Sequence, residues 1–316
     1  MRALVVAPKL TFQSHKPDPA PTAGQSIVRV SLAGICGTDL ELMRGYMGYR
    51  GIPGHEFVGR VTDTNDPNLR GQRVVGEINA ACGRCSYCRS GHARHCPERT
   101  VLGILGRDGA FAEYLRLPNE NMLPVPDSIP DETAVFTEPL AAAYEILEQL
   151  HLDRDRTIVV LGDGRLGALI ALALKRENYL PILAGHHPEK LGRLVSLGLA
   201  TSLEQDLKDR FDYVVDCTGH GDGLRRATEL VQPRGTIVLK STAAAGAVLN
   251  LAPLVINEIT VVGSRCGRFA PALAALESGR LDPRPLIDGT FPLEEAAAAV
   301  EAAAKSSNFK ILLKPS

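Results

Sequence analysis

The chain has 316 residues, enough for two domains of ordinary size, and 45% of them are hydrophobic. Its 35 basic and 36 acidic side chains give a net charge of −1, which excludes the strongly basic surface that nucleic acids and anionic membranes attract. No apolar run is long enough for a transmembrane helix, and the first residues lack the apolar core of a signal peptide. We therefore expect a cytoplasmic protein without nucleic-acid or membrane partners.

The first part of the chain, up to about Leu117, has the pattern of short strands. Runs rich in Val and Ile at 26–32, 56–61 and 70–76 are separated by Gly, Pro and Asp. This pattern predicts a barrel-like or sandwich-like β domain. Further on, Pro139 interrupts an Ala- and Leu-rich stretch, which predicts two helical pieces that meet near Glu138.

From Arg156 onward, predicted strands and helices alternate, which indicates a doubly wound parallel sheet. The tail is predicted to contain two helices and a last strand that stands apart from the alternating pattern and is available to complete the first domain. The predicted strands lie at 157–161, 181–184, 213–216, 236–239, 259–262 and 309–313, and the predicted helices at 168–175, 188–197, 223–230, 271–276 and 293–305.

Four of the seven cysteines crowd into fifteen residues, in the pattern Cys82-x2-Cys85-x2-Cys88-x7-Cys96. In a large chain without a signal peptide, such spacing favours a metal over disulfides. Four thiolates can close a tetrahedron around zinc, so we expect a structural zinc ion here. Free buried cysteines and an iron–sulfur cluster are the alternatives.

A second candidate metal site has mixed ligands. Cys36, His55 and Glu56 offer a thiolate, an imidazole and a carboxylate, a set that suits a zinc ion with one position open to water or substrate. Asp39 is placed to orient His55 through its other ring nitrogen. Glu138 is a further candidate carboxylate, and its alternative is a solvated glutamate at a helix end.

A glycine-rich loop follows the predicted strand at 157–161. Gly162-x-Gly164-x-Leu166-Gly167 stands between a strand and a helix, the context in which such a loop binds the pyrophosphate of a dinucleotide. The end of the next strand lacks the acidic residue that binds the ribose of NAD. Gly185 and His186 stand there, with Lys190 beyond, so we predict that NADP is favoured over NAD.

These segments together resemble the zinc-dependent medium-chain dehydrogenases/reductases, the alcohol and polyol dehydrogenase family. A glutamate at position 138 resembles the sorbitol and threonine dehydrogenase branch. The segments that carry the resemblance are 34–39, 54–56, the four-cysteine segment, 108–114, 137–140 and 162–167.

The resemblance implies an α/β protein with a GroES-like, β-rich catalytic domain at 1–138 and 268–316 and a structural-zinc lobe at 80–97. A Rossmann domain for NAD(P), a doubly wound parallel sheet, is implied at 139–267. Two zinc ions per chain are expected, one catalytic and one structural. A homodimer or homotetramer is also expected, through the edge of the cofactor sheet at 259–262.

The resemblance also implies roles for single residues. Cys36 and His55, with Glu138 or Glu56, are expected to bind the catalytic zinc ion, and Thr38 to relay the substrate proton. Lys190 matches a family lysine near the adenine ribose. The sequence departs from the family where Glu41 replaces the histidine of the liver-type proton relay and where Gly185 replaces the ribose-binding acid.

The predicted function is the interconversion of an alcohol, such as a polyol or a secondary alcohol, and its ketone or aldehyde by hydride transfer. Cys36, Thr38, His55 and Glu56 are the predicted catalytic group. A zinc-independent NADPH quinone or enoyl reductase of the same superfamily is one alternative, and a non-catalytic NADP-binding redox sensor is another.

Overall fold

The computed structural model describes residues 1–242 and 250–315. The chain forms two compact units: unit 1 contains Met1–Glu138 and Arg268–Ser316, and unit 2 contains Pro139–Gly267. Within the described ranges, no helix combines the length and the apolar character that crossing a membrane requires.

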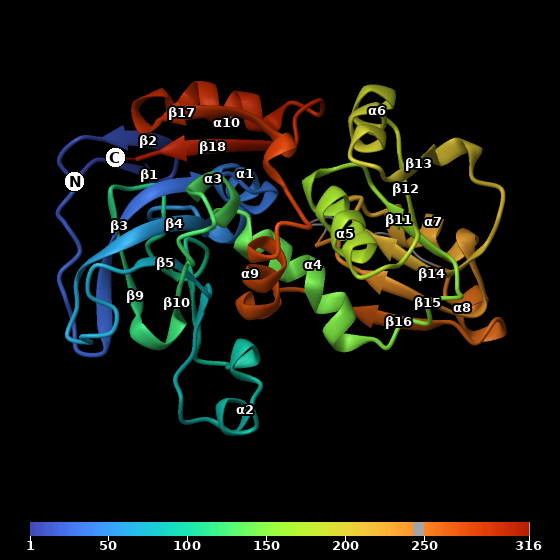
Figure 1. Cartoon of the computed structure of the whole chain (residues 1–316), viewed down its shortest axis with the longest axis horizontal. Coiled ribbons are helices and arrows are strands. Elements are labelled where there is room, and N and C mark those ends of the chain that lie inside the picture. The colour runs from blue at the N-terminus through green and yellow to red at the C-terminus, as the bar shows by residue number, and fades with distance from the viewer. Residues whose placement is uncertain (243–249, 316) are drawn as a thin grey trace. The chain divides into compact units, whose positions relative to one another are not determined.

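Unit 1 is built on a seven-stranded sheet in the order β10-β5-β4-β3-β18-β17, with β9 also paired to β3 (Figure 1). Its long strand β3 buries most of its apolar side chains in the core, as the Val- and Ile-rich run predicted. These strands are β3 (Gln25–Gly34), β4 (Glu56–Asp63), β5 (Arg73–Gly76), β9 (Tyr114–Pro118), β10 (Met122–Pro124), β17 (Ile287–Pro292) and β18 (Lys310–Lys314).

The C-terminal tail completes this sheet. The strand predicted at 309–313 is present as β18, and it pairs antiparallel with β3, with Leu312 opposite Gly34. Its other neighbour, β17, runs parallel to it and was not predicted. The sequence of β17, Ile-Asp-Gly-Thr-Phe-Pro, carries Asp, Gly and Pro, so its composition resembles a turn more than a strand.

Smaller elements surround the sheet of unit 1. A hairpin of β1 and β2 and a three-stranded sheet in the order β6-β7-β8 lie outside it. The strands are β1 (Ala3–Val6), β2 (Leu10–Gln13), β6 (Asn79–Ala80), β7 (Thr100–Leu102) and β8 (Gly106–Arg107); the helices are α1 (Gly37–Met43), η1 (Tyr46–Gly48), α2 (Ser86–Arg89), η2 (Ala93–His95), η3 (Asn119–Asn121), α3 (Asp131–Ala134), α9 (Phe269–Glu277), η5 (Arg284–Leu286), η6 (Leu293–Glu295) and α10 (Ala296–Ala304).

The proline in the Ala-rich stretch has a different role from the predicted one. Two helices are present, α3 and α4 (Thr137–Gln149), but the break between them lies at Val135 and Phe136. Pro139 therefore lies in the first turn of α4. Proline is tolerated there because the backbone N–H groups of a first turn have no partner within the helix.

Unit 2 is a six-stranded parallel sheet in the order β13-β12-β11-β14-β15-β16, with helices between successive strands (Figure 1). Its core includes Val159, Leu161, Val214 and Ile237 from the central strands. The elements are β11 (Ile158–Leu161), α5 (Arg165–Arg176), β12 (Pro181–Gly185), α6 (Pro188–Ser196), β13 (Ala200–Leu203), η4 (Glu204–Asp206), β14 (Phe211–Asp216), α7 (Gly223–Leu230), β15 (Val231–Leu239), α8 (Ala252–Ile256) and β16 (Thr260–Gly263).

The alternation predicted from Arg156 onward is confirmed, with one strand added. The unpredicted strand β13 has the sequence Ala-Thr-Ser-Leu and none of its residues is fully buried. A short, half-exposed edge strand lacks the apolar run that identifies its buried neighbours. The strand order reverses beside β11, where open parallel sheets bind nucleotides.

Candidate metal and cofactor sites

The mixed metal site lies at one end of the central strands of unit 1. Cys36 precedes helix α1, and Glu56 is the first residue of β4, opposite Gly34 at the end of β3. A side chain at position 34 would collide with the Glu56 carboxylate, so glycine is required there. The local fold thus places the three predicted ligands Cys36, His55 and Glu56 together, with their ligand atoms all within 4.8 Å of one another.

The Asp39 carboxylate supports this arrangement through its hydrogen bonds. One carboxylate oxygen, Oδ1, lies 3.1 Å from His55 Nδ1 and accepts the backbone N–H of Gly54, and the other accepts the N–H of Cys36 at 2.8 Å. The Asp39 side chain is fully buried. Burial lowers the pKa of His55. The charge of Asp39 and its hydrogen bond outweigh this effect and hold the pKa of His55 well above its usual value. Nδ1 is engaged by Asp39, which leaves Nε2 of His55 to bind a metal.

Glu56 is divided between two roles. Its Oε2 forms a buried ion pair of 2.5 Å with Lys310 of β18, and both side chains are 1% exposed. Its Oε1 is buried and has no hydrogen-bond partner among the described residues. A buried carboxylate oxygen without a partner is costly. A cation bound between Cys36, His55 and Glu56 would satisfy it, so the donor set fits zinc.

Glu138 lies close enough to interact with the same charges but is not in the group of ligand atoms. Its pKa is raised to about 7: burial is the largest cause, His55 and Lys310 lower the pKa, and Glu56 and Asp39 raise it. Glu138 and Glu56 therefore both interact with the positive charges of this site. The sequence left open which of the two carboxylates binds the metal. Thr38 lies in the first turn of α1, two residues after Cys36, and its Oγ1 is 3.9 Å from Cys36 Sγ.

The four-cysteine site is assembled in the segment around α2 and η2. Sulfur–sulfur distances of 3.4 Å between Cys85 and Cys88, 3.8 Å between Cys85 and Cys96, and 3.9 Å between Cys82 and Cys88 are present. Four thiolates bound to one zinc ion at about 2.3 Å would be about 3.8 Å apart, so the spacing fits. Burial and neighbouring thiols raise the pKa of Cys88 to about 12, a cost that a bound cation removes.

The glycine loop requires glycine at two of its positions and is open at a third. Gly162 has a φ of 109°, which favours glycine, and a side chain at Gly167 would collide with the Gly162 carbonyl. At Gly164, the N-cap of α5, an added Cβ would meet no atom within 4 Å, so this side of the loop is open. Leu166 is half-buried in the first turn of α5.

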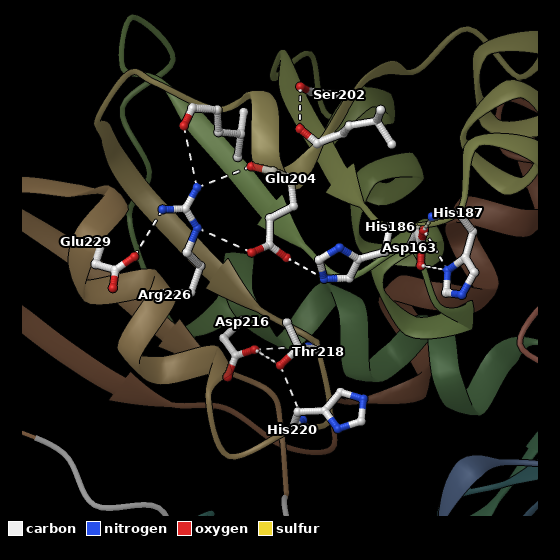
Figure 2. Close-up of polar contacts among 12 residues, drawn as sticks. Asp163, His186, His187, Ser202, Glu204, Asp216, Thr218, His220, Arg226 and Glu229 are labelled. Atoms are coloured by element: carbon white, nitrogen blue, oxygen red, sulfur yellow. Dashed lines mark hydrogen bonds and ion pairs between the residues drawn. The ribbon is translucent and has the colours of Figure 1, made fainter.

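The end of β12 holds a carboxylate that sequence reasoning missed. A Cβ at Gly185 would collide with the carboxylate of Asp163, which comes from the glycine loop. Figure 2 shows Asp163 facing His187: its Oδ2 accepts the backbone N–H of His187 at 2.8 Å, and its Oδ1 lies 3.0 Å from the ring Nδ1. An acid inside the glycine loop, at the second position of the motif, is the sequence signal that could have identified it.

A second imidazole is held in the same way. His186 Nε2 lies 2.9 Å from Glu204, whose other oxygen faces Arg226 at 3.3 Å (Figure 2). Lys190, predicted near the ribose, is only 4% exposed in α6. The structure thus exposes two histidines at this position, each paired with a carboxylate.

Comparison with known proteins decides the family. A model of the alcohol dehydrogenase GroES-like domain matches residues 22–127, and a model of zinc-binding dehydrogenases matches residues 170–278. The chain belongs to the zinc-type medium-chain alcohol dehydrogenase family. The predicted fold, a GroES-like domain with a Rossmann-like parallel sheet, is confirmed.

Three relatives illustrate the similarity. The sorbitol dehydrogenase of Halalkalibacterium halodurans is 28% identical, over 95% of this chain and 94% of its own. The D-altritol 5-dehydrogenase of Agrobacterium fabrum is 29% identical over 86% of each chain. A crystal structure of a short chain alcohol dehydrogenase from Escherichia coli CFT073, complexed with NADH, superposes with a TM-score of 0.92 at 26% identity and covers 99% of both chains.

Proposed function

We propose that this chain is a zinc-dependent NAD(P) oxidoreductase that oxidises a polyol or another secondary alcohol to its carbonyl compound, reversibly. The observation that carries the proposal is the convergence of the ligand atoms of Cys36, His55 and Glu56. In addition, Oε1 of Glu56 is buried and has no hydrogen-bond partner among the described residues. The names of the relatives, which act on sorbitol and altritol, support a polyol as substrate.

The two units take different parts in this proposal. Unit 1 is the catalytic domain, with a structural zinc lobe at 80–97, and unit 2 binds the dinucleotide through Gly162, Gly164, Leu166 and Gly167. When bound, zinc supplies Lewis-acid polarisation of the alcohol oxygen, and the nicotinamide supplies the hydride acceptor. Cys36 and His55 hold the catalytic ion with a carboxylate, Glu56 or Glu138.

The protein's own groups then manage the proton and the charge. The Thr38 hydroxyl accepts the proton of the substrate hydroxyl and donates its own onward. Asp39 keeps His55 in one orientation, and the ion pair with Lys310 keeps the Glu56 carboxylate in place. Glu41, which stands where liver-type relatives have a relay histidine, is paired with Arg44 at the surface.

Replacing Thr38 with valine is expected to lower kcat for alcohol oxidation by about 10²–10⁴-fold, because proton transfer by a positioned group contributes about that much. Thr38→Ser keeps the hydroxyl and should retain kcat within about tenfold of the native value. Steady-state kinetics at saturating cofactor make the comparison. Equal activity of the valine and serine variants would remove Thr38 from the proton path.

NADP is proposed as the favoured cofactor. The Asp163 carboxylate is covered by His187, with 8% of its side chain exposed against 42% for His187, so an incoming ribose meets the imidazole before the carboxylate. With Nδ1 held by Asp163, Nε2 of His187 remains available to contact a 2′-phosphate. Gly185 adds no side chain that would obstruct the phosphate.

The His187→Ala variant should lose about tenfold in kcat/KM with NADP, since a hydrogen bond to a charged group contributes about 1.5–3 kcal/mol, and should change little with NAD. His151→Ala, an exposed histidine outside this cluster, is the matched control. Kinetics with both cofactors and one alcohol provide the test. Equal losses with NAD and NADP would indicate a structural role for His187 without cofactor selectivity.

Self-association is proposed to occur through β16. This strand lies at one edge of the unit 2 sheet, and three of its four residues are exposed. An exposed apolar edge strand is a liability in a monomer, because it offers unpaired backbone groups to another chain. Analytical ultracentrifugation of the native chain and of Val261→Lys is the test, and a native monomer would exclude the dimer and tetramer alike.

A further inference from the structure

Unit 1 contains a cavity of about 530 Å³ that none of the proposed zinc ligands lines. The N-terminal loop around Pro17 and the strands β8 and β9 form its walls. We call it the arginine cavity and define it by its charged lining residues, which are Lys16, Asp18, Arg50, Arg107, Asp108 and Arg116.

Two guanidinium groups of this cavity are fixed in place by neutral acceptors. Arg107 donates through Nε to Thr100 Oγ1 at 3.0 Å, and through Nη1 to Gln25 Oε1 at 3.1 Å and to a backbone carbonyl at 3.2 Å. Arg116, which supplies that carbonyl, donates through Nη1 to the carbonyl of Ala20 at 2.9 Å. Both side chains are therefore oriented by hydrogen bonds that leave their positive charges uncompensated.

Ion pairs do not supply the missing charge. Across residues 1–242 and 250–315, no carboxylate forms an ion pair with Arg50, Arg107, Arg116 or Lys16. Burial lowers the pKa of Arg107, and the like charge of Arg116 lowers it further. Like charges near one another in a partly buried site are unfavourable, so the arrangement favours an added anion.

The two acidic side chains of the cavity are already engaged elsewhere. Asp18 Oδ1 binds the amino group of Met1 at 2.8 Å. Asp108 Oδ1 accepts the backbone N–H of Ile52 at 2.9 Å. Four cationic side chains thus face two carboxylates with other partners, on a chain whose net charge is only −1.

We propose that the arginine cavity binds a small oxyanion ligand, a metabolite that carries a phosphate or carboxylate group. A guanidinium has five N–H donors, and the described contacts use only the Nε and Nη1 donors of Arg107 and the Nη1 donors of Arg116. The unused Nη2 edges offer the planar, paired donors that bind phosphate and carboxylate oxygens. Fixed donors lose little conformational freedom when such a ligand arrives.

Calorimetric titration of the full chain with its metals, in low-salt buffer without dinucleotide or alcohol, tests the proposal. Inorganic phosphate, a hexose 6-phosphate and citrate are titrated separately, which distinguishes phosphate from carboxylate ligands. We expect saturable binding of at least one of them at one site per chain. The affinity should fall at least about tenfold in Arg107→Gln/Arg116→Gln, since each charged hydrogen bond contributes about 1.5–3 kcal/mol. It should persist in Arg29→Gln/Arg280→Gln, which changes two exposed arginines outside the cavity.

Arg50→Gln is the second variant, in case the double variant does not fold. Arg50 is exposed, so its replacement should preserve folding while still lowering the affinity for the anion at least about threefold. Absence of saturable binding to the native chain at millimolar anion, or equal binding in every variant, overturns the proposal. Association between chains that the double variant abolishes, without anion binding, also overturns it and identifies an interface. The titration involves no turnover, so its failure leaves the dehydrogenase proposal intact, and the reverse also holds.

Discussion

Replacing Cys36 with serine is expected to reduce alcohol oxidation by at least about 10³-fold, because metal polarisation of the substrate oxygen contributes several kcal/mol to the barrier. Cys36 supplies the only thiolate of the mixed site among the described residues, with His55 and Glu56 as its neighbours. The variant should contain one zinc ion per chain fewer than the native protein while still binding the dinucleotide. Metal analysis, steady-state kinetics and cofactor fluorescence together measure these three expectations.

Two further variants calibrate this result. Cys266→Ser removes a thiol from unit 2 and should leave zinc content and activity at native levels. Asp39→Asn keeps all the proposed ligands but weakens the support of His55, so metal affinity should fall about 10–100-fold, less than in Cys36→Ser. Full activity of Cys36→Ser with native zinc content would refute the proposed ligand set.

The second large effect concerns the buried ion pair between Lys310 and Glu56. Lys310→Met leaves a carboxylate that is 1% exposed without its cation, and breaking such a pair costs about 3–5 kcal/mol. Lys310 also lies 5.8 Å from the centre of the Phe136 ring, so part of its packing is lost as well. We therefore expect a marked fall in the unfolding temperature of the holoenzyme.

A matched control lies on the same strand. Lys314→Met changes an exposed lysine of β18 and should alter stability by no more than about 0.5 kcal/mol. The double variant Glu56→Gln/Lys310→Met removes both charges, and we expect it to be more stable than Lys310→Met alone. If Lys310→Met unfolds at the native temperature, the ion pair does not hold Glu56, and its proposed positioning role is wrong.

The sequence predicted the strands and helices with continuous or periodic apolar patterns, such as β11, β14 and α7. It missed β13 and β17, whose residues are short, polar or typical of turns, because their strand conformation depends on pairing with neighbours. Pro139 was interpreted correctly as a boundary signal but assigned to the wrong side of the helix junction. A single proline cannot distinguish the end of one helix from the first turn of the next.

The groups of candidate metal ligands were more predictable than their surroundings. Cys36, His55 and Glu56 were grouped from residue type alone because the ligand chemistry of zinc is restrictive. Lys310 was not found, since it reaches Glu56 from a strand 254 positions further along the chain. Asp163 was missed for a related reason: the expected acid was sought on β12, whereas the carboxylate that fills this space comes from the neighbouring loop.

Zinc dependence of turnover tests the central claim most directly. The purified chain would be assayed for oxidation of a polyol panel with NAD and NADP, before zinc removal by a chelator, after removal and after zinc is restored. The account predicts two zinc ions per chain, loss of turnover when the ion at Cys36 and His55 is removed, and recovery when it returns. Undiminished hydride transfer by zinc-free protein would contradict it and favour a zinc-independent reductase of the same superfamily.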